Sequence, residues 1–270
     1  MTRRVLLWCA YLLPLGYVGL IFAVTVHEVL GHGLTAVLCG GEFRSFYVAP
    51  DGMGAAWSFA PGSRVAVLAG GTIAQVVLGG LLLGASVLLR RRLLLRAALL
   101  LLAFNLFLDG LPYGFWDAVY MGGRGDVSRI LSYDAWAPHR TLFLIGLGLL
   151  LVASVAVTCR MLIRTLEDDL GALSFGAAAG LAFAMALGVG LGSAAFDWNQ
   201  LIPGADLMPT YGNTALQIAV GVWLVLTRRR AVEPHPVSAR GWTVAIPVAW
   251  ALCLATVIVV IRWLRHGVSW

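Results

Sequence analysis

Apolar residues run along this chain in long, almost uninterrupted stretches, separated by short polar segments that contain arginine. A membrane span needs about 20 mainly apolar residues, and only helices satisfy the backbone in lipid without closing a barrel. We therefore predict an all-α integral membrane protein with about seven transmembrane helices. The expected spans are Val5–Val26, Val65–Leu89, Ala97–Trp116, Thr141–Cys159, Leu170–Phe196, Leu207–Thr227 and Gly241–Ile261.

The segment between the first two expected spans has a different pattern. Two short apolar-rich runs, Phe43–Ala49 and Gly54–Phe59, flank a Pro-Asp-Gly sequence at positions 50–52. Asp-Gly between two such runs is a typical hairpin signal. We therefore predict a small β-hairpin between the first two transmembrane helices.

The composition indicates that much of the surface faces lipid. Of the 270 residues, 60% are hydrophobic and 12% are charged, and the mean hydropathy is +0.87. A soluble domain of this length carries about a quarter charged residues. The net charge of +6 comes from arginines at the ends of the spans, where they mark cytoplasmic loops and predict a cytoplasmic N-terminus. We expect a multi-pass protein of the cell (plasma) membrane, with membrane lipid and no nucleic acid among its partners.

The first expected span ends in the run TVHEVLGHG, residues 25–33. Two histidines and a glutamate in apolar surroundings are costly and so indicate a function, although a polar helix end at the membrane surface is the structural alternative. In the HExxH pattern, both histidines bind zinc from one helix face and the glutamate is a general base. Here His27 and His32 are five residues apart, so on an α-helix they point about 140° away from each other. A π-bulge absorbs one residue, and Gly31 lowers the cost of such a distortion.

The run Ile21–Gly41, IFAVTVHEVLGHGLTAVLCGG, resembles the signature helix of the site-2 protease family of intramembrane zinc peptidases. The usual form is a hydrophobic run, HExGH, small residues and a glycine-rich turn, and the HEVLGH spelling is similar to the expanded motif of dipeptidyl-peptidase III. On the next span, Leu68–Gly71 resembles the family's Ala-Gly-Pro, with Gly71 in place of the proline. The family's asparagine position falls at Ala74, beside Gln75.

The family's third zinc ligand is an aspartate, and two positions in this chain compete for that role. Asp109 precedes a glycine in apolar surroundings, where an unpaired carboxylate is costly. Asp126 lies in Gly125–Leu131, which resembles the Gly-Asp-Trp-type segment of divergent members. We favour Asp126, with Asp109 and Asp117 as alternative ligands and an ordinary loop residue as the structural interpretation of Asp126.

The resemblance implies an intramembrane zinc metalloendopeptidase that hydrolyses a transmembrane protein or peptide substrate. Zn²⁺ would be bound by His27, His32 and Asp126, with Glu28 as general base and then proton donor to the leaving amine. Two alternatives are a catalytically inactive zinc-binding membrane scaffold and a proton-coupled transporter that uses Asp109 and the histidines as a relay.

We expect one polytopic membrane domain over residues 1–270, because no long polar segment divides the chain. Within it, residues 1–135 would form the metalloprotease-like core, and residues 136–270 would add further transmembrane helices.

Overall fold

The computed structural model describes residues 3–50, 52–121, 125–171, 177, 180–181 and 236–269. Within this part of the chain, five helices are long and apolar enough to cross a membrane, the first of them running without interruption over Arg3–Leu38. The helical elements are α1 (Arg3–Thr25), η1 (Val26–Gly33), α2 (Leu34–Leu38), α3 (Arg64–Leu88), α4 (Leu93–Tyr120), α5 (Asp126–Leu131), η2 (Ala137–His139), α6 (Arg140–Leu170), α9 (Ala239–Arg262) and η3 (Leu264–His266).

The predicted class, a helical membrane protein, is confirmed, and five of the expected spans coincide with long helices. The expected spans Leu170–Phe196 and Leu207–Thr227 fall almost wholly outside the described residues. The total of seven transmembrane helices therefore stays a prediction.

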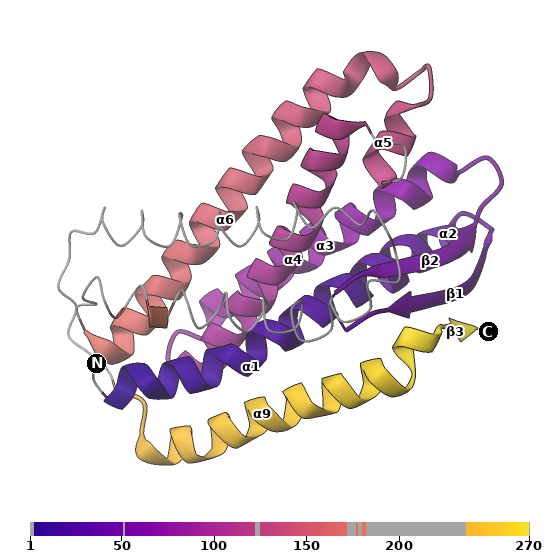
Figure 1. Ribbon diagram of the computed structural model, residues 1–270. Coiled ribbons are helices and arrows are strands. Elements are labelled where there is room, and N and C mark those ends of the chain that lie inside the picture. The colour runs from indigo at the N-terminus through magenta and orange to yellow at the C-terminus, as the bar shows by residue number, and fades with distance from the viewer. Residues whose placement is uncertain are drawn as a thin grey trace.

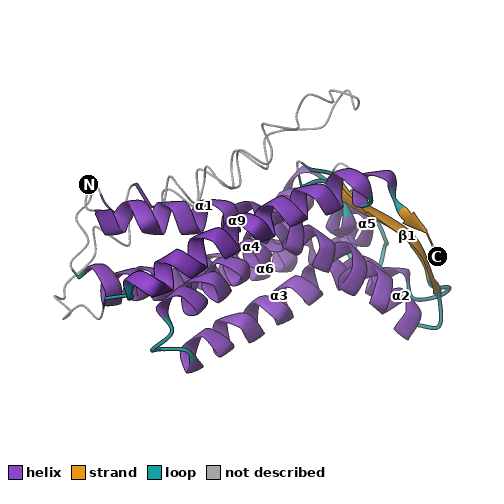
Figure 2. Ribbon diagram, turned by 90° about the horizontal axis from the view of Figure 1, so that it is seen from below, coloured by secondary structure: helices purple, strands orange, loops and turns teal. Residues whose placement is uncertain are grey.

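The long helices lie side by side, and the strands and α5 lie at one end of the bundle (Figure 1). Helix α4 is central, because it packs against α1, α3 and α6, whereas α9 packs against α1. The N-terminus lies at the end of the bundle away from the strands, and the C-terminus lies beside them (Figures 1 and 2). The end where α1 continues into η1 is therefore also the end where α5 and the strands meet.

A three-stranded antiparallel sheet covers that end of the bundle, in the order β2-β1-β3. Strands β1 (Glu42–Val48) and β2 (Gly54–Phe59) form the predicted hairpin, which is confirmed. The sequence did not indicate β3 (Val268–Ser269), which pairs with β1 through Phe46 and Val268. Strand β3 covers one edge of the hairpin, so in the described sheet β2 is the other edge strand.

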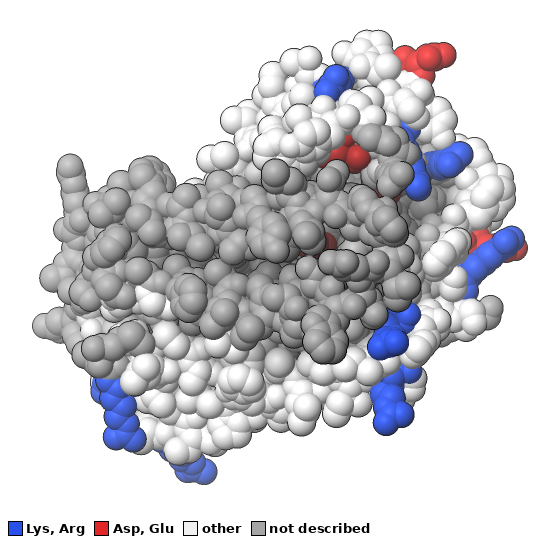
Figure 3. All heavy atoms as spheres, in the orientation of Figure 1, with Lys and Arg blue, Asp and Glu red and all other residues white. Residues whose placement is uncertain are grey.

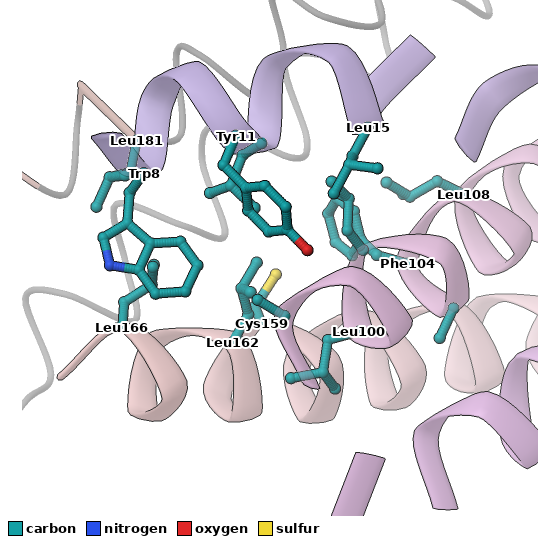
Figure 4. Close-up of a cluster of buried hydrophobic side chains, with 14 of the residues drawn as sticks. Trp8, Tyr11, Leu15, Leu100, Phe104, Leu108, Cys159, Leu162, Leu166 and Leu181 are labelled. Atoms are coloured by element: carbon teal, nitrogen blue, oxygen red, sulfur yellow. The ribbon is translucent and has the colours of Figure 1, made fainter. Parts of the chain in front are cut away.

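The largest buried cluster lies between α1, α4 and α6 (Figure 4). Trp8 and Tyr11 project from α1 toward Phe104 on α4 and Leu162 on α6. The Trp8 ring packs edge-on against Trp242 of α9, with ring centroids 5.0 Å apart. This aromatic packing joins the N-terminal helix to the last long helix of the chain.

The outer faces of α6 and α9 carry large apolar side chains, as expected for helices in contact with lipid. These exposed residues include Leu142, Ile145, Leu149 and Val152 on α6, and Val244, Val248, Leu252 and Leu254 on α9. On the face drawn in Figure 3, described basic side chains lie at the lower left and along the right-hand side, and the described surface along the lower edge between them carries no Lys or Arg. This distribution fits a protein whose middle is embedded in lipid.

The end of the bundle opposite the sheet is held together by the buried carboxylate of Asp169, in the last turn of α6. Its Oδ2 accepts a hydrogen bond from Trp8 Nε1 at 2.8 Å, and its Oδ1 accepts one from the backbone N–H of Val237 at 2.5 Å. Arg4 Nη1 donates to the Asp169 carbonyl at 3.2 Å. One residue thus connects α1, α6 and the segment that leads into α9.

We predict that Asp169→Ala destabilises the fold, because it leaves the N–H groups of Trp8 and Val237 buried without an acceptor. Each unpaired group costs about 1–3 kcal/mol, so the thermal unfolding temperature in detergent should fall clearly. Asp134→Ala is the control, since Asp134 is an exposed carboxylate beyond α5. Substitution of such an exposed side chain usually changes the free energy of unfolding by less than about 0.5 kcal/mol. Equal effects of the two substitutions would contradict the role assigned to Asp169.

Candidate metal centre

The helix that carries both histidines changes from α to π geometry at the HExxxH motif. The π-helix η1 spans eight residues, and the N–H of Leu34 bonds to the carbonyl of Val29, five residues earlier. In this geometry His27 and His32 lie on the same side of the helix, with ring centroids 4.8 Å apart. The predicted π distortion is therefore confirmed, and it removes the angular mismatch that the extra residue would cause on an α-helix.

Helix α3 approaches η1 closely because both carry glycine at the contact. A Cβ atom at Gly31 would overlap the backbone of Gly71, and one at Gly70 would lie 2.5 Å from the Gly31 carbonyl oxygen. A Cβ at Gly71 would lie 2.5 Å from Nε2 of His27. Larger residues at these positions would push α3 away from the histidines.

Because of this close approach, groups of α3 lie within hydrogen-bonding distance of the Nδ1 atom of each imidazole. His32 Nδ1 lies 2.8 Å from the backbone carbonyl of Val67, and His27 Nδ1 lies 2.9 Å from Oε1 of Gln75. The Val67 carbonyl can only accept, so His32 Nδ1 carries a proton. The Nε2 atom of His32 in the neutral ring is then an available metal ligand, as is usual for metal-binding histidines.

The carboxylate of Asp126 lies where the two Nε2 atoms converge. Its Oδ2 atom is 3.1 Å from Nε2 of His27 and 3.2 Å from Nε2 of His32. Burial alone would raise the pKa of Asp126, but the two imidazoles beside its carboxylate hold the pKa of this carboxyl below its ordinary value. Asp126 is therefore an anion at neutral pH.

Contacts with the end of α4 position helix α5, and Asp126 is the first residue of α5. The Asp117 carboxylate accepts a hydrogen bond from the backbone N–H of Ser128 at 2.7 Å, so it binds the N-terminus of α5. A Cβ on Gly125 would overlap that carboxylate. Arg140 in turn donates to the carbonyl of Ala118 at 2.9 Å, near the end of α4.

The donor set fits a zinc ion. Two neutral imidazole nitrogens and a carboxylate oxygen are all acceptors, so a cation or protons must lie between them. Donor atoms on a tetrahedral zinc with bonds of about 2.0–2.1 Å are about 3.3 Å apart. The Nε2–Oδ2 distances of 3.1 and 3.2 Å lie close to that separation.

Glu28 lies beside the two histidines and has one side-chain oxygen available for a further hydrogen bond. Its side chain is buried, and the ligand atoms of His27, Glu28 and His32 all lie within 4.8 Å of one another. Its Oε2 atom has no hydrogen-bond partner among the described residues. A buried carboxylate oxygen without a partner is costly, so Glu28 is suited to accept a proton or a hydrogen bond from a molecule in the cavity.

A cleft connects these groups to strand β2. One cavity of about 370 Å³ is lined by His27, Glu28 and Asp126 together with Gly54–Ala56 of β2. A second cavity of about 370 Å³ lies beyond His32 and is lined by Ser58 and Phe59 of the same strand. The two cavities share His32, Ala56, Asp126 and Arg129, so they are adjoining parts of one cleft along β2.

The structure brings together His27, Glu28, His32 and Asp126, the four residues chosen from the sequence. Asp109, the main alternative to Asp126, lines the same cavity, but its Oδ2 accepts a hydrogen bond from Gln75. Asp117 holds α5.

Two residues near the site were not predicted to belong to it. Gln75 was noted only as the neighbour of Ala74, although a lone amide in an apolar span is a signal for a polar partner. Tyr113 lines the cavity, with its ring centroid 5.9 Å from that of His27.

The fold and the site together define a helical membrane protein with a buried His-Glu-His-Asp cluster at one end of the bundle. Residues 3–174 match the Peptidase M50B-like family, so the chain belongs to this site-2-protease-type family of peptidases. Comparisons with curated proteins and with solved structures gave no match.

We predict that the detergent-purified protein contains about one zinc per chain, as usual for a site with a single ligand set. His27→Ala and Asp126→Ala should each lose that zinc, because each removes one of three converging donors. Elemental analysis after metal-replete expression measures the content. Asp134→Ala is the control, since Asp134 is an exposed carboxylate outside the cluster. Absence of zinc from the wild type would contradict the site, and zinc retained without Asp126 would exclude that residue as a ligand.

We also predict that Gly71→Ala weakens zinc binding, because the new methyl group would press on the imidazole of His27. Gly80→Ala is the matched control on the same helix, since a Cβ there meets nothing within 4 Å. Displacing one ligand should raise the zinc dissociation constant by about 10–100-fold, which competition with a chelating dye can measure. Equal zinc affinity of the two variants would show that the contact at Gly71 does not constrain the histidine.

Proposed function

We propose that this protein is an intramembrane zinc metalloendopeptidase that hydrolyses peptide bonds of membrane-embedded or membrane-adjacent substrates, in the cell membrane. The observation that carries the proposal is the convergence of His27 Nε2, His32 Nε2 and Asp126 Oδ2 beside Glu28 Oε2, which has no hydrogen-bond partner in the described part of the chain. Membership of a peptidase family supports the same activity.

His27, His32 and Asp126 would hold the zinc ion beside the cavity that Glu28 also lines. Zinc bound there would supply Lewis-acid activation of a water molecule and of the scissile carbonyl. Glu28 would take the proton from that water at Oε2 and then deliver it to the leaving amine. The Nδ1 atoms of His32 and His27 lie within hydrogen-bonding distance of the Val67 carbonyl and of Gln75 Oε1.

Strand β2 would hold the substrate in an extended form. A peptide bond inside a transmembrane helix is hidden by its own hydrogen bonds, so the helix must unwind locally before hydrolysis. In the described sheet, β2 has β1 on one side only, and its residues line the cleft beside the proposed ligands. An unwound segment could add to that edge as a further strand, which would satisfy its backbone groups.

We predict that Glu28→Gln abolishes cleavage and leaves zinc binding intact, because an amide cannot accept the proton. Loss of a general base typically lowers the rate by about 10²–10⁴-fold. A panel of single-span transmembrane peptides in detergent, analysed by mass spectrometry with and without chelator, serves as the assay. Asp134→Gln is a control that changes a carboxylate outside the cluster.

Two outcomes would overturn the peptidase proposal. Zinc binding without cleavage of any peptide in the panel would favour the catalytically inactive scaffold. Chelator-insensitive proton-coupled transport that is abolished by Asp109→Asn would favour the transporter. Cleavage that persists in Glu28→Gln would exclude Glu28 as the base.

A further inference from the structure

Gln75 is a fully buried amide in the middle of α3, and its side chain bonds to three different elements. Its Nε2 lies 3.0 Å from the carbonyl oxygen of Ala23 on α1 and 2.5 Å from Oδ2 of Asp109 on α4. Its Oε1 lies 2.9 Å from Nδ1 of His27 on η1. The amide therefore uses both of its N–H groups and its carbonyl oxygen.

These partners determine which way the amide faces. The backbone carbonyl of Ala23 can only accept, so the NH₂ group of Gln75 must point toward Ala23 and Asp109. The carbonyl oxygen of Gln75 then faces His27, so Nδ1 of His27 must carry the proton. In the neutral imidazole this leaves the lone pair on Nε2, directed toward Asp126.

Asp109 anchors the amide from the other side. Its carboxylate accepts from Gln75 and opens onto the same cavity as Glu28. The next residue, Gly110, leaves the space that Gln75 occupies, because a Cβ there would overlap Oε1 of Gln75. In the Asp-Gly pair on α4, the aspartate therefore accepts a hydrogen bond from the Gln75 amide, and the glycine leaves space for it.

We propose that Gln75, held by Asp109, is a positioning residue that fixes the proton of His27 on Nδ1 and so presents Nε2 as a metal ligand. The inference rests on the proposed zinc site and adds a carboxylate–amide–imidazole chain behind it. Such groups behind a ligand raise its basicity and fix its orientation, and their loss lowers metal affinity by about 10–100-fold. His32 is held by a backbone carbonyl instead, so substitution can test only the His27 side.

A double-mutant cycle on the full-length protein tests the proposal, with the zinc dissociation constant measured by competition with a chelating dye. Gln75→Met keeps the side-chain volume but removes the hydrogen bonds that link Asp109 to His27. We expect zinc to bind about 10–100-fold more weakly. Asp109→Asn keeps an acceptor for Gln75 but removes the charge, and we expect a loss of about tenfold or less. If Asp109 acts through Gln75, Asp109→Asn should have no further effect in the Gln75→Met protein, because the link is already cut.

The transposed variant Gln75→Glu/Asp109→Asn provides a rescue. The new carboxylate would accept from His27 Nδ1, and the new amide at position 109 would donate to it, but the carboxylate could not donate to the Ala23 carbonyl as the Gln75 amide does. We therefore expect a zinc affinity between that of Gln75→Met and that of the wild type. The absorption spectrum of the cobalt-substituted protein should likewise move toward the wild-type shape, which recovery of fold stability alone would not produce. Asp134→Asn is the control for removing a carboxylate.

Three results would overturn the inference, and each differs from failure of the proposed function. Unchanged zinc affinity in Gln75→Met would show that the amide does not position His27. A loss of zinc affinity in Asp109→Asn that multiplies in full with the loss in Gln75→Met would show that Asp109 acts independently of Gln75, as a direct ligand would. A folded transposed variant that binds no zinc, or that binds it no more tightly than Gln75→Met, would exclude the hydrogen-bonded link between positions 109, 75 and 27. If the proposed zinc site is absent, by contrast, the wild type binds no zinc at all.

Discussion

The candidate metal centre depends on the close contact between η1 and α3. Gly31 of η1 faces Gly70 and Gly71 of α3, and a Cβ on any of the three would overlap the neighbouring backbone or the imidazole of His27. This contact brings the Val67 carbonyl and the Gln75 amide within hydrogen-bonding distance of the two histidines. Because interiors are close-packed and transmit displacements, even a methyl group at this contact would move the proposed ligands. Small residues that allow helices to approach are common in membrane proteins, and here they serve the geometry of a site.

The extra residue of the motif is accommodated in the backbone. On an α-helix, His27 and His32 could not face a common point, whereas η1 places both on one side. π segments are rare because their packing is less favourable, and they are usually found at functional sites. Hydrogen bonds from both imidazoles to α3, and the contacts of both Nε2 atoms with Asp126, offset that cost. The extra residue between the histidines and the π geometry of η1 therefore belong together, because the π geometry brings both histidines to the same side of the helix.

Much of this architecture follows from local sequence patterns, and the remainder depends on contacts between distant segments. Apolar stretches predict the long helices, the Pro-Asp-Gly sequence predicts the β1–β2 hairpin, and the HExxxH spacing predicts the π distortion, because each signal is local. Pairing of β3 with β1 and the bond between Gln75 and Asp109 join elements far apart in the chain. These contacts depend on how the helices pack against one another, which the hydrophobic periodicity of the sequence does not specify. Asp126 could be favoured from its resemblance to a family segment, but its position depends on Asp117 at the start of α5.

Asp109 and Asp126 have different partners, and for this reason only Asp126 contacts the Nε2 atoms of the histidines. A catalytic zinc site uses three protein ligands and keeps a fourth position open, whereas four protein ligands make a closed, structural site. Asp109 and Asp126 line the same cavity, so an Asp109 carboxylate free to swing toward the Nε2 atoms could close the site. The hydrogen bond from Gln75 directs the Asp109 carboxylate toward the amide, and through the amide it connects Asp109 to Nδ1 of His27. In the proposed zinc site, the same bond would therefore keep Asp109 away from the metal and orient His27.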